Sequence, residues 1–183
     1  FVPSDFEKLL MRRLACLADF DLAAHDHIDI KDTLECLRRL DKFIAVSWLK
    51  TVCNGWCTSH RMHEDKLLQC IFGCVGCKDT LSHYLSCPIL WSIIDSVFRC
   101  PIGPTVFHRL GLHAPAPQTI IMLVTAQCMY HTLKVSHRHI ALHALTSRRF
   151  GPCIEIITNT ASEYRSQYAV SYTHLTLPTN RCV

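Results

Sequence analysis

The chain has 183 residues, of which 49% are hydrophobic and 19% charged. This is enough apolar material for the core of one or two small domains, which excludes a disordered chain. The formal net charge of +4 would help binding to a polyanion but does not demand it. The longest apolar stretch, Ile120 to Ala126, is far shorter than the roughly 20 residues of a membrane-spanning helix, which argues against a membrane protein.

Cysteine and histidine are unusually frequent, with twelve of each. Because the two are intermixed and no signal-peptide pattern opens the sequence, we expect reduced thiols and metal chemistry inside the cell, in the nucleus or cytoplasm. The first residue is Phe1 rather than Met. We therefore expect the natural amino terminus to lie upstream, and the chain to be a fragment.

The first 52 residues are expected to form an N-terminal helical segment. From Ile28 to Val52 apolar residues recur at helical spacing, which predicts one long helix. Asn54 and Gly55 follow, and both tolerate a left-handed backbone. The predicted helix therefore ends before them.

Residues 53–98 are expected to form a small metal-stapled module. Cys70, Cys74, His83 and Cys87 are spaced C-x3-C-x8-H-x3-C. A tight loop can hold the first two, and a short helix can hold the last two on one side, one turn apart. Because three thiolates and an imidazole are the ligands of structural zinc sites, the spacing predicts zinc as the cofactor.

A second set of four ligands is possible, in which Cys77 replaces Cys70. With Cys74, His83 and Cys87 it gives C-x2-C-x5-H-x3-C, which also has plausible reach. A third interpretation is a helical core with buried free cysteines and no ion. The spacing leaves Cys70 and Cys77 as alternatives and favours a bound metal over the third interpretation.

A second run of ligand-type residues precedes this module. Cys53, Cys57, His60 and His63 are spaced C-x3-C-x2-H-x2-H. These residues are too close together for comfortable tetrahedral closure. We therefore expect a turn between helices, built around a buried Trp56.

Residues 99–169 are expected to form a helical region. The pattern predicts a long helix from Gln118 to Arg149, ended by Gly151-Pro152, and a last helix over Cys153–Tyr168. Three histidines of the long helix are interpreted as a polar face: His137, His139 and His143. The predicted fold class is mainly α, with a small zinc-stapled Cys/Cys/His/Cys module between helices and at most a short pair of strands at the cysteine loop.

The end of the chain resembles translated sequencing adapter. Val170 to Thr179 read VSYTHLTLPT, which matches one reading frame of the transposase-recognition end used in library adapters. The next four residues fit the index and the codons that follow it. We therefore interpret residues 170–183 as a non-native tail and exclude Cys182 as a ligand.

Three segments together carry a resemblance to a known family. They are NGWCTSHR at 54–61, the C-x3-C loop, and KDTLSHYLSCPILW at 78–91. This combination resembles the region after the polymerase in non-LTR (LINE-type) retrotransposon reverse transcriptases. That region carries a Cys/Cys/His/Cys zinc motif, with an acidic residue before the histidine and a tryptophan after the last cysteine. The matching positions here are Cys70, Cys74, His83 and Cys87, with Asp79 and Trp91. The resemblance therefore implies Cys70 rather than Cys77 as the first ligand.

The resemblance implies a role beside a polymerase. It implies that the module contacts template RNA or target DNA, with Arg61, Lys66 and Lys78 as candidate phosphate contacts, and that an upstream polymerase domain of the same polyprotein is a partner. Asp79 is interpreted as a helix cap, a role that Thr80 could also fill.

Three aromatic residues have two interpretations. Trp56, Tyr84 and Trp91 could be platforms on which bases stack. They could equally belong to the core, and for Trp91 the core is favoured.

Catalysis is not expected of this chain. Polymerases hold two metal ions on carboxylates, but no two aspartates are adjacent here, and after Asp95 the only acids are Glu155 and Glu163. Two hypotheses remain. The first is a non-catalytic, nucleic-acid-binding zinc module of a retroelement reverse transcriptase, and the second is a zinc-stabilised helical protein-interaction domain.

Overall fold

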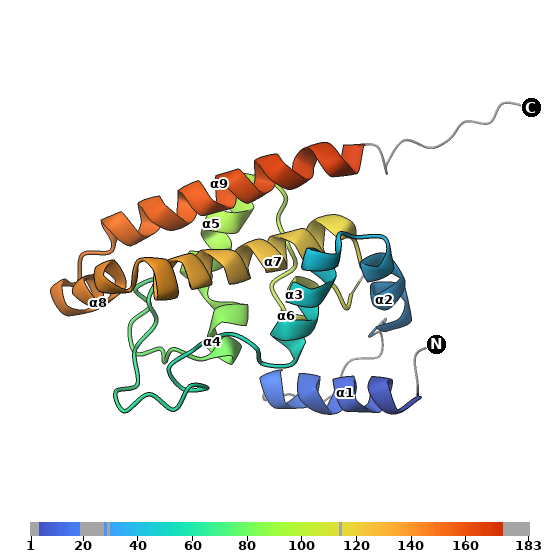
Figure 1. Cartoon of the computed structure of the whole chain (residues 1–183), viewed down its shortest axis with the longest axis horizontal. Coiled ribbons are helices and arrows are strands. Elements are labelled where there is room, and N and C mark those ends of the chain that lie inside the picture. The colour runs from blue at the N-terminus through green and yellow to red at the C-terminus, as the bar shows by residue number, and fades with distance from the viewer. Residues whose placement is uncertain (1–3, 19–27, 29, 114, 174–183) are drawn as a thin grey trace, which may run out of the picture.

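The computed structural model describes residues 4–18, 28, 30–113 and 115–173, and this part of the chain is mainly helical, as predicted (Figure 1). Its only strand pairing is an isolated antiparallel bridge between Gln69 and Lys78. The elements in chain order are α1 (Ser4–Ala18), α2 (Ile30–Arg38), α3 (Lys42–Val52), α4 (Leu81–Ser86), α5 (Pro88–Phe98), α6 (Val106–Arg109), α7 (Pro117–His131), the π-helix η2 (Thr132–Ser136), α8 (Arg138–Ser147) and α9 (Gly151–Thr173).

Helix α7 lies at the centre of the molecule. Every residue from Ile120 to Gln127 is buried, because α3, α5, α6 and α9 all pack against this helix. A helix that is apolar on all sides must be covered on all sides. The apolar run from Ile120 to Ala126 is thus the middle of the core. Among the described residues, no helix is long and apolar enough to cross a membrane.

The predicted helix over residues 28–52 is two helices, so that prediction was wrong. Helix α2 ends at Arg38, and Asp41 then caps α3, since its carboxylate accepts a hydrogen bond of 2.7 Å from the Phe43 amide. An aspartate that satisfies a free amide favours a new helix start over continuation. The end of α3 was predicted correctly, because Asn54 has a left-handed φ of 55°.

The predicted helix over residues 118–149 is also interrupted. Helix α7 passes into the π-helix η2, and His137, with φ −122° and ψ 33°, separates η2 from α8. A π turn holds one residue more than an α turn, which changes the side-chain phase beyond it. Here it lets the ammonium of Lys134 enter the core, where the side chain is only 3% exposed.

The last helix was predicted, but its start was misplaced. Gly151 and Pro152 are the first residues of α9 and do not end the preceding helix. Proline fits the first turn of a helix because its missing backbone N–H would have no partner there. Arg148, in the left-handed conformation, ends α8 instead. Helix α9 continues to Thr173, and residues 174–183 of the adapter-like tail, Cys182 included, lie outside the described residues.

One hydrophobic core joins the three segments expected from the sequence. It runs from Leu10 and Leu14 in α1, through the cysteine loop, to Ile157 and Ala161 in α9. Burying one such side chain contributes about 1.5–3 kcal/mol. The module at residues 53–98 is therefore packed against the helices on both sides of it in the sequence.

Candidate metal centre

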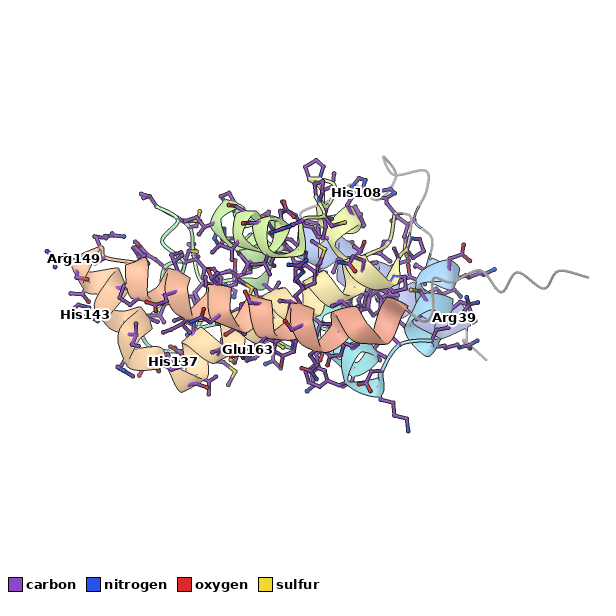
Figure 2. All side chains as sticks on the ribbon, turned by 90° about the horizontal axis from the view of Figure 1, so that it is seen from above. Arg39, His108, His137, His143, Arg149 and Glu163 are labelled. Atoms are coloured by element: carbon purple, nitrogen blue, oxygen red, sulfur yellow. The ribbon has the colours of Figure 1, made fainter. Side chains whose placement is uncertain are left out.

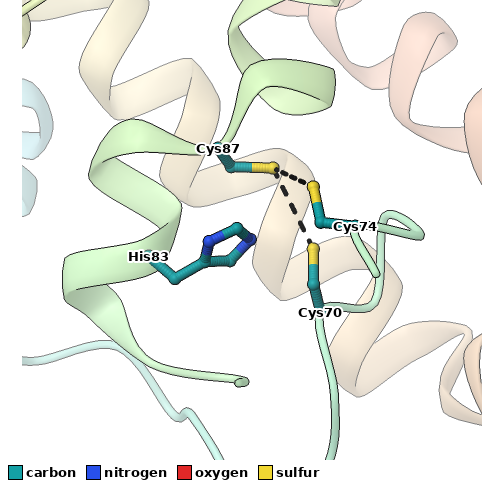
Figure 3. Close-up of side chains that lie close together, drawn as sticks. All are labelled: Cys70, Cys74, His83 and Cys87. Carbon is teal, nitrogen blue, oxygen red and sulfur yellow. Dashed lines mark hydrogen bonds between the residues drawn. The ribbon is translucent and has the colours of Figure 1, made fainter. Parts of the chain in front are cut away.

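Two of the four predicted ligands are placed by the short helix α4. Its N-cap is Thr80, whose hydroxyl accepts a hydrogen bond of 3.3 Å from the His83 amide. His83 and Cys87 are one turn apart and project to the same side of this helix (Figure 3). Pro88 follows in the first turn of α5, so the chain can change direction at Cys87.

The other two ligands are placed by a tight loop. The Cys70 amide donates to the Cys77 carbonyl at 2.8 Å, and the Gly73 amide donates to the Cys70 carbonyl at 3.1 Å. Gly73 has φ 102°, a conformation that residues with a β-carbon rarely adopt. This backbone turns the Cys70 and Cys74 thiols toward α4.

The four side chains converge on one point. The Sγ atom of Cys87 lies 3.5 Å from that of Cys74 and 3.9 Å from that of Cys70, and all four candidate ligand atoms lie within 4.8 Å of one another (Figure 3). The Nε2 atom of His83 is buried without a hydrogen-bond partner. A buried, unpaired imidazole nitrogen is costly unless something binds it, so the cluster fits a metal ion.

The thiols influence one another's ionisation. A hydrogen bond from Cys87 holds the pKa of Cys70 below its ordinary value. The same hydrogen bond raises the pKa of Cys87, and burial raises that of Cys74. Without a bound ion, the three thiols therefore do not ionise alike. A bound cation would favour ionisation of all three, and its binding would release protons.

The other candidate ligands lie outside this cluster. Cys77 contributes its backbone carbonyl to the loop, but its thiol is not part of the group. The run from Cys53 to His63 forms no metal-type cluster in the described residues. Instead the Cys57 thiol lies 3.3 Å from Nδ1 of His131, beside the predicted turn around a fully buried Trp56.

The histidines of the predicted polar face lie on and beside α8. His139 and His143 are exposed and His137 is partly exposed. None belongs to a metal-type cluster in the described part of the chain.

Asp79 is a buried polar centre and not the helix cap, so that interpretation was wrong. Its carboxylate accepts hydrogen bonds from the Ser59 amide at 2.7 Å and from the hydroxyls of Tyr84 and Tyr130 at 2.7 and 3.1 Å. Its side chain is fully buried and forms an ion pair of 3.0 Å with Lys134. These contacts join three distant parts of the chain.

The lysine of this ion pair has a second acidic partner. Lys134 lies 3.1 Å from a carboxylate oxygen of Glu64, which also pairs with Arg138 at 3.0 Å. Hydrogen bonds from Arg138 and then from Lys134 hold the pKa of Glu64 below its ordinary value. The loop that carries Glu64 is thereby fastened to η2 and α8.

The three candidate stacking residues belong to the core. Trp56 and Tyr84 are fully buried and Trp91 is 2% exposed. The Trp91 indole donates to the Tyr84 carbonyl at 3.0 Å. None of these rings is available to a nucleic-acid base, so that interpretation was wrong.

The three predicted phosphate contacts lie at the surface. Arg61, Lys66 and Lys78 are all exposed. Lys78 is next to Asp79 and opposite Gln69 in the β-bridge. Of the three, Lys78 alone directly follows the loop of residues 70–77 that carries Cys70 and Cys74, here called the metal loop.

Comparisons with known proteins add no relative to this description. No protein-family model, curated protein or solved structure matches the chain.

Proposed function

We propose that the cluster binds zinc and that the chain is a non-catalytic segment of a non-LTR retrotransposon reverse transcriptase that contacts nucleic acid. The observation that carries this proposal is the convergence of Cys70, Cys74, His83 and Cys87 on one point. The resemblance of residues 54–61 and 78–91 to the region after the polymerase supports the family.

The spacing of the sulfur atoms supports zinc. A tetrahedral ion with zinc–sulfur bonds of about 2.3 Å places its sulfur ligands about 3.8 Å apart. The two close Sγ–Sγ distances, 3.9 Å for Cys70–Cys87 and 3.5 Å for Cys74–Cys87, lie on either side of this value. Three thiolates and one imidazole favour zinc over magnesium or calcium, which prefer oxygen ligands.

The role of the module in nucleic-acid binding is supported by the exposed cations Arg61, Lys66 and Lys78. Phosphate contacts need side chains of this kind at defined positions. The role is proposed to be non-catalytic because the sequence has no two adjacent aspartates and has only Glu155 and Glu163 as acids after Asp95, whereas polymerases hold two metal ions on carboxylates. Chemistry would then belong to an upstream polymerase domain.

Metal binding is tested on the full chain. Zinc content after purification should be one ion per chain, and replacement by cobalt should give the intense absorption of thiolate coordination. Cys70→Ser should lower the zinc content and weaken this absorption, whereas Cys77→Ser should leave both unchanged. Equal, full binding by the two variants would contradict the Cys70 assignment.

Nucleic-acid binding is tested with the zinc-loaded chain. Its affinity for single-stranded RNA and for duplex DNA should fall linearly with salt on a logarithmic scale, because phosphate contacts release counterions. Absence of binding to either at about 50 mM salt would refute the nucleic-acid role.

One observation favours the alternative, a zinc-stabilised helical protein-interaction domain. A groove of about 910 Å³ lies between residues 64–69 and α8, and Leu67, Leu142 and Leu145 are among the residues that line it. Leu67 is 53% exposed. Exposed leucines in a groove are typical of peptide-binding sites. Binding of protein partners without any salt-dependent binding of nucleic acid would support this alternative.

A further inference from the structure

We infer that Lys66, Lys78, Arg148 and Arg149 form one basic surface that binds the phosphate backbone of a nucleic-acid duplex. This inference rests on the proposed function and adds to it. The two arginines lie about fifty residues beyond the module in the sequence, so the spacing of the motif gave no reason to include them.

The β-bridge and one hydrogen bond place Lys78 and Arg148 on the same face. Gln69 and Lys78 are directly opposite in the antiparallel bridge, and residues opposite each other project to the same side. The Gln69 side chain accepts a hydrogen bond of 3.3 Å from the guanidinium of Arg148. The side chains of Lys78 and Arg148 are therefore both neighbours of the Gln69 side chain on this face.

The groove beside α8 brings in Lys66. Lys66, Gln69 and Arg148 all line it. Arg149 follows Arg148 and is exposed at the end of the molecule where α8 turns into α9 (Figure 2). The four cations thus come from the loop before the metal ligands, the loop between them, and the α8–α9 turn.

The α8–α9 turn is packed directly on the metal loop. A β-carbon added at Gly73, between Cys70 and Cys74, would lie 2.9 Å from the ring of Phe150. Only a glycine permits so close an approach. This packing places the two arginines near the metal cluster independently of the hydrogen bond from Arg148 to Gln69.

The charges of the basic surface are free for a ligand. None of the four cations forms an ion pair within the described structure. Arg138 also lines the groove, but Glu64 neutralises it. Asp65 lines the groove as well and offsets one positive charge, which leaves the surface cationic.

The chemistry of this surface favours a duplex over a single strand. Proteins that bind single strands combine cations with exposed aromatic rings on which bases stack. The rings of Trp56, Tyr84 and Trp91 are buried. Cations without stacking rings suit a backbone whose bases are already paired, and they carry no sequence preference.

The test measures binding of the full, zinc-loaded chain to a labelled DNA duplex and to one of its single strands by fluorescence anisotropy. Two double variants are compared with wild type, Arg148→Gln with Arg149→Gln, and Lys66→Gln with Lys78→Gln. The control, Arg38→Gln with Arg39→Gln, removes two exposed arginines that pair with Glu35, one at the last residue of α2 and one directly after it. Arg39 lies at the opposite end of the molecule from Arg149 (Figure 2).

Each test variant should weaken duplex binding and reduce the slope of log affinity against log salt by about 2, close to 0.9 per lost phosphate contact. The control should leave the slope unchanged. Zinc content and helical circular dichroism should match wild type in all variants, since glutamine can keep the hydrogen bond to Gln69.

Three results would overturn the inference. An unchanged slope in the Arg148/Arg149 variant would overturn it while leaving the proposed function intact. Tighter binding of the single strand than of the duplex would overturn the choice of ligand. Absence of binding by wild type would remove the proposed function as well.

Discussion

Two polar centres lie side by side in this molecule, and they are completed in different ways. Around Asp79 each polar group meets a protein partner, since an amide, two hydroxyls and an ammonium surround one carboxylate. Around Cys87 the protein supplies three thiols and an imidazole whose Nε2 has no partner. The chain alone completes the first centre, whereas a metal ion would complete the second.

Tyr84 connects the two centres. It follows the ligand His83 in α4, its hydroxyl donates to Asp79, and the same oxygen accepts from the Ile71 amide at 3.3 Å in the ligand loop. Loss of the ion should therefore disturb the loop first and the carboxylate centre second. Loss of the carboxylate should weaken the fold without removing any ligand.

Metal removal should have the largest effect. Structural zinc contributes on the order of 10–16 kcal/mol of apparent binding energy in small modules, which is comparable with the whole stability of a domain. We expect Cys87→Ser, or a strong chelator, to abolish the cooperative thermal unfolding of the chain, as measured by circular dichroism. The control is Cys16→Ser, an exposed thiol of α1, which should melt like wild type.

Breaking the carboxylate centre at Asp79 should cause the next largest loss of stability. Asp79→Asn leaves the buried ammonium of Lys134 with only the more exposed Glu64, and removing one member of a buried ion pair costs about 3–5 kcal/mol. Urea unfolding of the zinc-loaded protein measures this loss, and zinc content should be unchanged. Asp65→Asn, at an exposed site, should alter stability by no more than about 0.5 kcal/mol. An equal loss of unfolding free energy in the two variants would contradict a stabilising role of the carboxylate centre.

A smaller loss is expected from one hydroxyl of the same centre. Tyr130 donates to Asp79 and also lies 3.1 Å from the Cys57 carbonyl. Tyr130→Phe should cost about 1–2 kcal/mol, because a buried acceptor loses its donor. In the double variant with Asp79→Asn the two losses should not add, since both residues belong to one network.

The smallest effect concerns pH. The pKa of Glu64 is held below its ordinary value of 4.5, so the ionised carboxyl stabilises the fold above that pH, and the contribution is lost as pH falls through the lowered pKa. We expect Glu64→Gln to cost up to about 1 kcal/mol at neutral pH, because a partly solvated pair is screened. Wild type and variant should converge in acid. A stability difference between wild type and variant that grows below pH 4.5 would contradict the lowered pKa of Glu64.

The ligand cluster could be predicted because its information is local. Cys70, Cys74, His83 and Cys87 lie within eighteen residues, and their spacing alone limits how they can meet. The end of α3 at Asn54 was predictable for the same reason. The break at Asp41 also had a local signal, an aspartate two residues before Phe43, but the hydrophobic periodicity on both sides concealed it.

The carboxylate centre could not be predicted in this way. Lys134 meets Asp79 across 55 residues, and it does so from a π turn that has no clear sequence pattern. The arginines of the basic surface come near the metal loop through the packing of Phe150 on Gly73 and the hydrogen bond from Arg148 to Gln69. Such pairings arise from tertiary packing, which hydrophobic periodicity does not report.

The number of residues in the π-helix at Thr132–Ser136 sets the rotation of α8 relative to α7. Each residue of an α-helix rotates the chain by about 100°, so deletion of one residue here would turn all of α8 by that angle relative to α7. Arg138 would leave Glu64, and Arg148 would leave Gln69. A substitution at the exposed Val135 changes one side chain, whereas a deletion beside it would separate the metal loop from the C-terminal helices.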